Sequence, residues 1–416
     1  MTIMQMSQLS PMSFRAVVQQ PCALDLCVET PWVTADDLNE TVLEVFGKHR
    51  DLTSLPVTED NRPIGLISRS IFLSQMSKPY HKELYGRKSC IAFMDKDPLI
   101  VDASMDIESL TFKAVEFGEK ALADGFIITR DSKLAGVGHG LQLMRIVADI
   151  QAARNRQVTH SIEYASVIQR SMLRTSRETL QNVLSDSDLV WEPRDIVGGD
   201  FYHFASQQGG WFGAVADCTG HGVPGAFMTL IASSSLAQAI EQLGADNPSQ
   251  LLAQVNRGIK QMLGQIDDQD ATPGSDDGMD AAFFWFNSAG LTLSFAGAKS
   301  ILFVLHPGEE GVEMIDGDRK GVGYVDSGMD YRWTNRLVQL RAGSLVFVTT
   351  DGLIDQIGGP KAIAFGKRRI RDVLLANRHQ PSRMINQAML ETFGEWQGQQ
   401  QRRDDLTFFC FRIQES

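Results

Sequence analysis

The sequence predicts an α+β protein made of two unlike halves that a long helix joins. In the back half, short apolar runs alternate with turns and the helical patterns come in blocks, which is typical of antiparallel sheets. In the front half, a strand–turn–strand pattern occurs twice. Between them, residues 141–184 carry a continuous helical pattern without Pro or Gly. Each observation defines one part of the chain.

Composition favours a soluble cytoplasmic protein with more than one domain. The 416 residues, 43% hydrophobic and 22% charged, are ordinary for globular domains. A net charge of −12 argues against nucleic acid or an anionic membrane surface as a partner. No apolar run approaches the roughly 20 residues of a membrane span, and the first residues are too polar for a signal peptide. The five scattered cysteines indicate reduced thiols.

The front half contains an internal repeat. Residues 58–66 and 129–137 align at an offset of 71 (129 − 58 = 71), and each copy is predicted to form strand, polar turn and strand. An amphipathic helical pattern precedes each copy and another follows it. We therefore expect two β-α-β-β-α units that pack as a pair.

Residues 26–150 resemble a tandem CBS pair, a small sensory module. The segments 55–58 (Leu-Pro-Val-Thr) and 65–69 (Gly-Leu-Ile-Ser-Arg) carry most of the likeness. The resemblance implies an adenine nucleotide between the copies, bound by a Ser or Thr and by an Asp three positions later. Ser68 fits the first position, but Ile71 stands where the Asp would be. A dimerisation scaffold without a ligand is the alternative.

The predicted linker helix covers residues 151–185. Its apolar residues step by four, three, three and four along one narrow stripe, namely Val158, Ile162, Ala165, Ile168 and Met172. Such a stripe suits a dimeric coiled coil or a helix packed on a neighbouring domain. Because this helix connects the two halves, a change in the front half could move it against the back half. We expect a homodimer formed through the CBS-like domain and this helix.

Four carboxylates of the back half follow or precede predicted strands: Asp200, Asp217, Asp351 and Asp404. Taken singly, each would be a solvated turn residue. If the strands are neighbours, however, the carboxylates gather at one end of the sheets and require cations to offset their repulsion. An all-oxygen site suits Mg²⁺ or Mn²⁺. A further acidic stretch, residues 267–280, is expected to be a mobile loop.

From about residue 164 onward the chain resembles the bacterial SpoIIE-type branch of metal-dependent Ser/Thr protein phosphatases. This family has a PP2C-like fold of two stacked β-sheets flanked by helices, which we place at residues 186–416; residues 1–25 are expected to form a flexible arm. The segments that carry the likeness are 163–165 with 168–169, 198–202, 217–225, 295–299, 317–319, 351–356 and 404–407.

The resemblance implies a site for two Mn²⁺ or Mg²⁺ ions. Asp217 would bridge both ions, and Asp351 and Asp404 would complete the first. The backbone carbonyl of Cys218 and a water-linked Asp200 would serve the second. The Cys218 thiol lies in no Cys-x5-Arg phosphate loop, so a nucleophilic role is disfavoured.

Four further residues are candidates for the substrate side. His221 would be a general acid or a brace of the turn, Lys299 and Arg319 would contact phosphate or be solvated, and Asp405 would be a supporting carboxylate or a further ligand. Many family members carry an Asn-Ala-Gly-His-type segment where this chain has Phe-Ala-Gly-Ala-Lys at 295–299.

These expectations combine into one function. The chain is predicted to be a cytoplasmic phosphatase that removes phosphate from Ser or Thr of a partner, implied by the family to be an anti-sigma-factor-antagonist-like (STAS) protein in a partner-switching pathway. The front half would control it. The alternatives are a catalytically inactive regulator that acts by binding a partner, and a nucleotide-sensing module.

Overall fold

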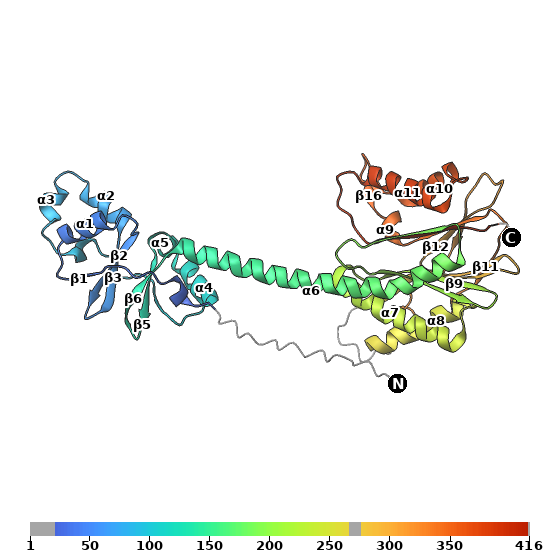
Figure 1. The fold of residues 1–416 in the computed structure, drawn as a ribbon, viewed down its shortest axis with the longest axis horizontal. Helices are drawn as coiled ribbons and strands as arrows, with labels where there is room; N and C mark the ends of the chain where they lie inside the picture. The colour runs from blue at the N-terminus through green and yellow to red at the C-terminus, as the bar shows by residue number, and fades with distance from the viewer. Residues whose placement is uncertain (1–20, 266–275, 415–416) are drawn as a thin grey trace, which may run out of the picture. The chain divides into compact units, whose positions relative to one another are not determined.

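The computed structural model describes residues 21–265 and 276–414, and the chain divides into two units after Gln157 (Figure 1). Most of the expected arm, residues 1–20, lies outside the described residues. Its last residues were assigned wrongly, because Ala23–Leu26 forms a short 3-10 helix whose Ala23 and Leu26 are buried. The front unit therefore begins before residue 26.

The front unit contains the two expected copies. In each copy, a short strand pairs parallel to the first strand of a hairpin, and a helix lies between them in sequence. The first copy consists of β1 (Val33–Thr34), α1 (Asn39–Lys48), β2 (Ser54–Glu59), β3 (Arg62–Ser68) and α2 (Arg69–Met76), followed by the short helices α3 (His81–Tyr85) and η2 (Cys90–Phe93). The second consists of β4 (Ile100–Asp102), α4 (Ile107–Phe117), α5 (Glu119–Asp124), β5 (Phe126–Arg130), β6 (Lys133–Gly138) and the start of α6.

The two hairpin turns confirm the repeat. Asp60 and Asn61 have φ values of 49° and 65°, and Asp131 and Ser132 have φ values of 52° and 61°. Two consecutive residues with positive φ are typical of the tight hairpin turn whose twist matches that of its strands. Both hairpins also carry a register shift at corresponding points, after Val57 and after Ile128. The same backbone conformation thus occurs twice, 71 residues apart.

The helical stretch forms one helix, α6 (Gly140–Val183), which contains the division between the units. Its buried side in the back unit is formed by Gln169, Leu173, Ser176 and Leu180, at steps of four, three and four. Of the predicted stripe, Met172 packs against the core, whereas Val158 and Ile168 are exposed in the single chain, and the dimeric coiled coil stays a prediction.

The back unit is a sandwich of two antiparallel five-stranded sheets. The first has the order β14-β11-β10-β9-β8 and the second β13-β12-β15-β18-β7. The strands are β7 (Ser187–Glu192), β8 (Asp200–Gln207), β9 (Gly210–Cys218), β10 (Met279–Asn287), β11 (Thr292–Ala298), β12 (Ile301–Leu305), β13 (Glu313–Asp316), β14 (Arg336–Gln339), β15 (Leu345–Thr349) and β18 (Leu406–Arg412).

Helices cover both outer faces (Figure 1). On the first sheet lie α7 (Gly222–Leu243) and α8 (Pro248–Leu263), and on the second lie α10 (Gly366–Ala376) and α11 (Ser382–Gln397). Between the sheets, Phe284 of β10 stacks on Phe409 of β18 with ring centroids 6.2 Å apart. Because both faces of β10 are covered, its residues 281–286 read as an unbroken apolar run. The α+β class and the flanked sandwich are confirmed.

One expectation about membranes was wrong. Within the described residues, α7 is long and apolar enough to meet the length and composition criterion of a membrane span. Its Met228, Ala232, Leu236 and Ala239 are buried in the core of the back unit. A core helix that packs on a sheet meets the same criterion, and this packing explains the apolar composition of α7.

Candidate functional site

Three carboxylates form a row across the first sheet. Asp200 of β8 is directly opposite Asp217 of β9, and Asp217 is directly opposite Asp280 of β10. Side chains directly opposite one another on antiparallel strands share one face and lie about 5 Å apart at Cβ. The row therefore concentrates negative charge at one end of this sheet.

The second sheet brings two further carboxylates to the same place. Asp351 is the first residue of α9 (Asp351–Ile354), directly after β15, and Asp404 precedes β18, the neighbour of β15. The charges of Asp200, Asp351 and Asp404 all raise the pKa of Asp217. The four carboxylates singled out from the sequence are thus close enough to interact, although up to 204 residues separate them (404 − 200 = 204).

Burial and mutual repulsion both raise the pKa values of these carboxylates. Asp200 is 1% exposed, and burial together with the charge of Asp405 raises its pKa well above the ordinary value. Burial also raises the pKa of Asp217 well above its ordinary value. For Asp351, desolvation raises the pKa although the side chain remains accessible, and the Asp404 charge adds to this effect. The side chains of Thr407 and Thr350 act in the opposite direction and lower the pKa of Asp200; Thr350 Oγ1 donates to Asp200 Oδ2 at 2.9 Å.

The donor set fits a hard divalent cation. Carboxylates that raise one another's pKa in a partly buried site are stabilised by bound cations, and oxygen ligands are those that Mg²⁺ and Mn²⁺ prefer. In the part of the chain that the structure describes, no group of three or more His, Cys, Asp or Glu side chains is already closed tightly enough to hold an ion. The chemistry of the residues therefore fits the ion, whereas coordination requires their side chains to draw together.

Cys218 does not have the properties of a nucleophile. Its side chain is 2% exposed, and burial, followed by the charge of Asp217, raises the pKa of the thiol well above its ordinary value. The thiol is therefore protonated at neutral pH, whereas nucleophilic cysteines have lowered pKa values. The Cys218 amide donates to the Gly199 carbonyl at 3.1 Å, which ties the two loops of the site together.

The turn before Asp200 is held from two sides. Gln169 of α6 donates from Nε2 to the Gly198 carbonyl at 2.7 Å and accepts from the Gly198 amide at 3.2 Å. Asp405 accepts from the backbone amides of Gly199 at 2.5 Å and Arg194 at 2.6 Å. A Cβ at Gly199 would lie 2.4 Å from the Gly220 carbonyl oxygen, so only glycine fits. This arrangement favours the interpretation of Asp405 as a supporting carboxylate.

A pocket of about 510 Å³ opens beside the carboxylates. Asp217, Asp280 and Asp351 line it together with the cationic side chains of Lys299, Arg319 and Lys367. His221 is not among its lining residues; its Nδ1 lies 3.0 Å from Asp195 Oδ2. The pocket thus combines an acidic end with cations, which suits a phosphorylated ligand and its metal ions.

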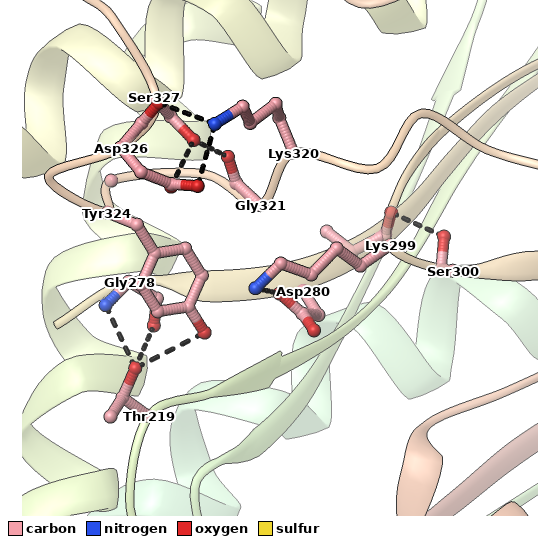
Figure 2. A network of polar contacts seen from close by, with 12 residues as sticks. Thr219, Gly278, Asp280, Lys299, Ser300, Lys320, Gly321, Tyr324, Asp326 and Ser327 are labelled. Carbon is pink, nitrogen blue, oxygen red and sulfur yellow. Dashed lines mark hydrogen bonds and ion pairs between the residues drawn. The ribbon is translucent and has the colours of Figure 1, made fainter. Parts of the chain in front are cut away.

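Figure 2 shows a polar network that includes three residues of the pocket lining, Asp280, Lys299 and Ser300. Lys299 Nζ lies 3.5 Å from Asp280 Oδ1 and 4.2 Å from the ring centroid of Tyr324. Thr219, in the loop after Asp217, has its hydroxyl 3.4 Å from the Tyr324 hydroxyl and also bonds to the Gly278 backbone. Lys320 pairs with Asp326 at 2.7 Å in the same segment as Tyr324. The network connects this segment to the Asp217 loop.

Sequence reasoning missed three of these residues. Asp280 was assigned to an acidic loop, but it lies in β10; residues 267–275 of that loop lie outside the described residues. Lys367 is the second residue of α10, a helix that was not anticipated. Gln169 belonged to a family motif but had no assigned role. The alignment of Asp280 with Asp217 depends on strand pairing, which no local pattern contains.

The front unit has a separate, smaller cavity of about 220 Å³ between its two copies. Ser68 donates a hydrogen bond to Asp124 there, and Lys120 pairs with Asp95 at 2.5 Å. Ile71 lines the same cavity. The two carboxylates outnumber the one lysine, so the local charge of the cavity is negative and disfavours binding of a polyphosphate.

Comparisons with known proteins identify both units. The family model described as Stage II sporulation protein E (SpoIIE) matches residues 207–414, half of the chain, and the CBS domain model matches residues 25–78. The SiaA PP2C domain of Pseudomonas aeruginosa is 36% identical, with a TM-score of 0.57, over 63% of this chain and 99% of that chain.

Two solved structures have lower scores. The PP2C domain of Bacillus subtilis SpoIIE, with a fragment of its regulatory domain, is 15% identical over 56% of this chain and 62% of that chain, with a TM-score of 0.45. The RsbU and RsbW domains of a Mycobacterium tuberculosis protein are 19% identical over the same shares, with a TM-score of 0.44. No curated protein matches the chain. The chain belongs to the SpoIIE family of PP2C-like phosphatase domains and carries an N-terminal CBS domain.

Proposed function

We propose that the chain is a Mn²⁺- or Mg²⁺-dependent phosphatase that removes phosphate from phosphoserine or phosphothreonine of a partner protein. The observation that carries this proposal is the convergence of Asp217 with Asp200, Asp351 and Asp404. Two of these carboxylates, Asp217 and Asp351, line a pocket that also contains cationic side chains. The 36% identity to a PP2C domain over nearly its whole length supports the same chemistry.

Each residue of the site would have a distinct role. Asp217 would serve both ions, Asp351 and Asp404 would help to hold one, and Asp200 and the Cys218 carbonyl would help to hold the other. Bound ions of this kind lower the pKa of a water molecule and neutralise charge on the phosphoryl oxygens. Lys299 and Arg319 line the pocket and would contact the phosphate. Gln169 and Asp405 hold the Gly198–Gly199 turn, which positions Asp200.

The partner that we propose is a small STAS-like phosphoprotein in the cytoplasm, as the family resemblance implies. A pocket open enough to receive a phosphorylated side chain from a folded protein is consistent with this substrate. The net charge of −12 disfavours nucleic acid. In the front unit, the acidic cleft favours the ligand-free scaffold over the adenine nucleotide.

The direct test is phosphate release by the full chain from a phosphoserine peptide and from a phosphorylated STAS protein. We expect release with Mn²⁺ or Mg²⁺ and none with EDTA, because the ions supply several kcal/mol of transition-state stabilisation. Calorimetric metal titration runs in parallel. Metal binding without hydrolysis of any phosphoprotein would favour the inactive, partner-binding regulator instead.

We further propose that the chain forms a homodimer through its helices. Tyr164, Val167 and Ile168 of α6 are exposed, as is Phe227 of α7, and Gln169 links these neighbouring helices through Thr229. Exposed apolar groups clustered on neighbouring elements mark interaction surfaces. Val167→Glu should convert a dimer at micromolar concentration into monomers in analytical ultracentrifugation, whereas Ser171→Glu, on an exposed polar position of α6, should not. A monomeric wild-type chain would refute this proposal.

A further inference from the structure

A lysine lies beside the outer end of the carboxylate row of the first sheet. The row consists of Asp200, Asp217 and Asp280, each directly opposite the next on paired strands. The pairing of β10 with β11 ends at Ala281 and Ala298, and Lys299 is the first residue after β11. Like charges directly opposite one another are destabilising, and a nearby opposite charge offsets them. The Lys299 ammonium, 3.5 Å from Asp280 Oδ1, supplies such a charge.

The position of Lys299 is specified by the backbone and by two contacts. Its φ is 50°, in the left-handed region that disfavours a residue with a side chain, and its amide donates to the Asp318 carbonyl at 2.7 Å. Its Nζ lies 3.5 Å from Asp280 Oδ1 and 4.2 Å from the Tyr324 ring centroid, which attracts a cation through its π face (Figure 2). Lys299 thus adopts an unfavourable backbone conformation at a place where its side chain contacts both Asp280 and Tyr324.

We infer that Lys299 is an internal counter-cation of Asp280 that competes with a divalent ion for this carboxylate and thereby limits metal binding at the outer end of the site. This inference rests on the proposed function, because it requires that Asp217 and its neighbours bind divalent ions. The Lys299 side chain is 39% exposed and lines the same pocket as Asp217, so an ion bound at Asp217 would lie near it. Removing the ammonium leaves Asp280 as an extra oxygen donor beside Asp217.

The test is calorimetric titration of the full chain with MnCl₂, which needs no substrate. Lys299→Met should bind Mn²⁺ at least about tenfold more tightly than wild type, or bind one additional ion, and Lys299→Arg should behave like wild type. The matched control is Lys320→Met, which removes a lysine of the same network whose partner is Asp326. This control should leave Mn²⁺ affinity within about twofold of wild type.

A double variant separates competition for Asp280 from a general charge effect. If Lys299 acts through Asp280, Lys299→Met should have no effect on Mn²⁺ affinity in an Asp280→Asn background. An unchanged affinity and stoichiometry in Lys299→Met, or an equal gain with and without Asp280, overturns the inference, as does a wild-type chain that binds no Mn²⁺. A wild-type chain that binds Mn²⁺ but hydrolyses no phosphoprotein refutes only the proposed function.

Discussion

Replacing Asp217 with Asn should lower kcat/KM for a phosphoprotein by about 1,000-fold, because several kcal/mol of transition-state stabilisation depend on correctly placed ions. The same change should remove the stabilisation of the fold by Mn²⁺. Burial, followed by the charges of Asp200, Asp351 and Asp404, raises the pKa of Asp217 well above its ordinary value, so its negative charge destabilises the metal-free protein. The metal-free variant should consequently be at least as stable as wild type.

The pH dependence of metal-free stability provides the second readout of this variant. The folded-state pKa values of Asp200, Asp217 and Asp351 are raised above the unfolded values, so the folded state binds more protons. Stability then falls as pH rises above the unfolded value of about 4. In EDTA, the Tm of wild type should decline from about pH 5 to about pH 8, and the decline should be shallower in Asp217→Asn. A variant that keeps both its activity and its Mn²⁺-dependent Tm shift would exclude the assigned role.

Replacing Gln169 with Leu should destabilise the back unit by about 3 kcal/mol, because both the amide and the carbonyl of Gly198 would lose their partner in a buried environment. Leucine keeps most of the side-chain volume, so the loss reports hydrogen bonding. Activity should fall about tenfold, since the Gly198–Gly199 turn positions Asp200 and a misplaced ligand weakens metal binding. Denaturant unfolding and the Mn²⁺ concentration for half-maximal activity measure the two effects.

The matched control is Gln181→Leu, which makes the same substitution at an exposed position of α6. It should change stability by less than about 0.5 kcal/mol and leave the Mn²⁺ requirement unaltered. If Gln169→Leu also falls within that range, α6 is not coupled to the catalytic turn through this side chain. If it behaves as expected, α6, which continues into the front unit, has a direct route to Asp200.

Whether a segment forms a helix or a strand could be predicted from the sequence, because this depends on the local pattern of apolar and polar residues. The hairpin repeat followed from polar turns 71 residues apart, and α6 followed from an uninterrupted helical pattern. The predicted stripe contained Ile168 and Met172, whereas the buried residues of α6 are the next ones along the chain, Gln169 and Leu173. Burial depends on the elements that lie against the helix and not on the helix alone. The helix α7 met a membrane criterion for the related reason that a core helix is apolar on its packed side.

The candidate site divides in the same way between sequence and tertiary structure. By itself the sequence determined which acids follow or precede strands, and hence Asp200, Asp217, Asp351 and Asp404, because a carboxylate at either end of an apolar run is a local feature. Only the tertiary structure decided that Asp280 extends the row of Asp217, that Lys299 lies beside Asp280, and that Gln169 holds Gly198. These relations depend on strand register and on side-chain contacts between distant segments. Register is fixed by packing of the whole sandwich, which no single stretch of the chain specifies.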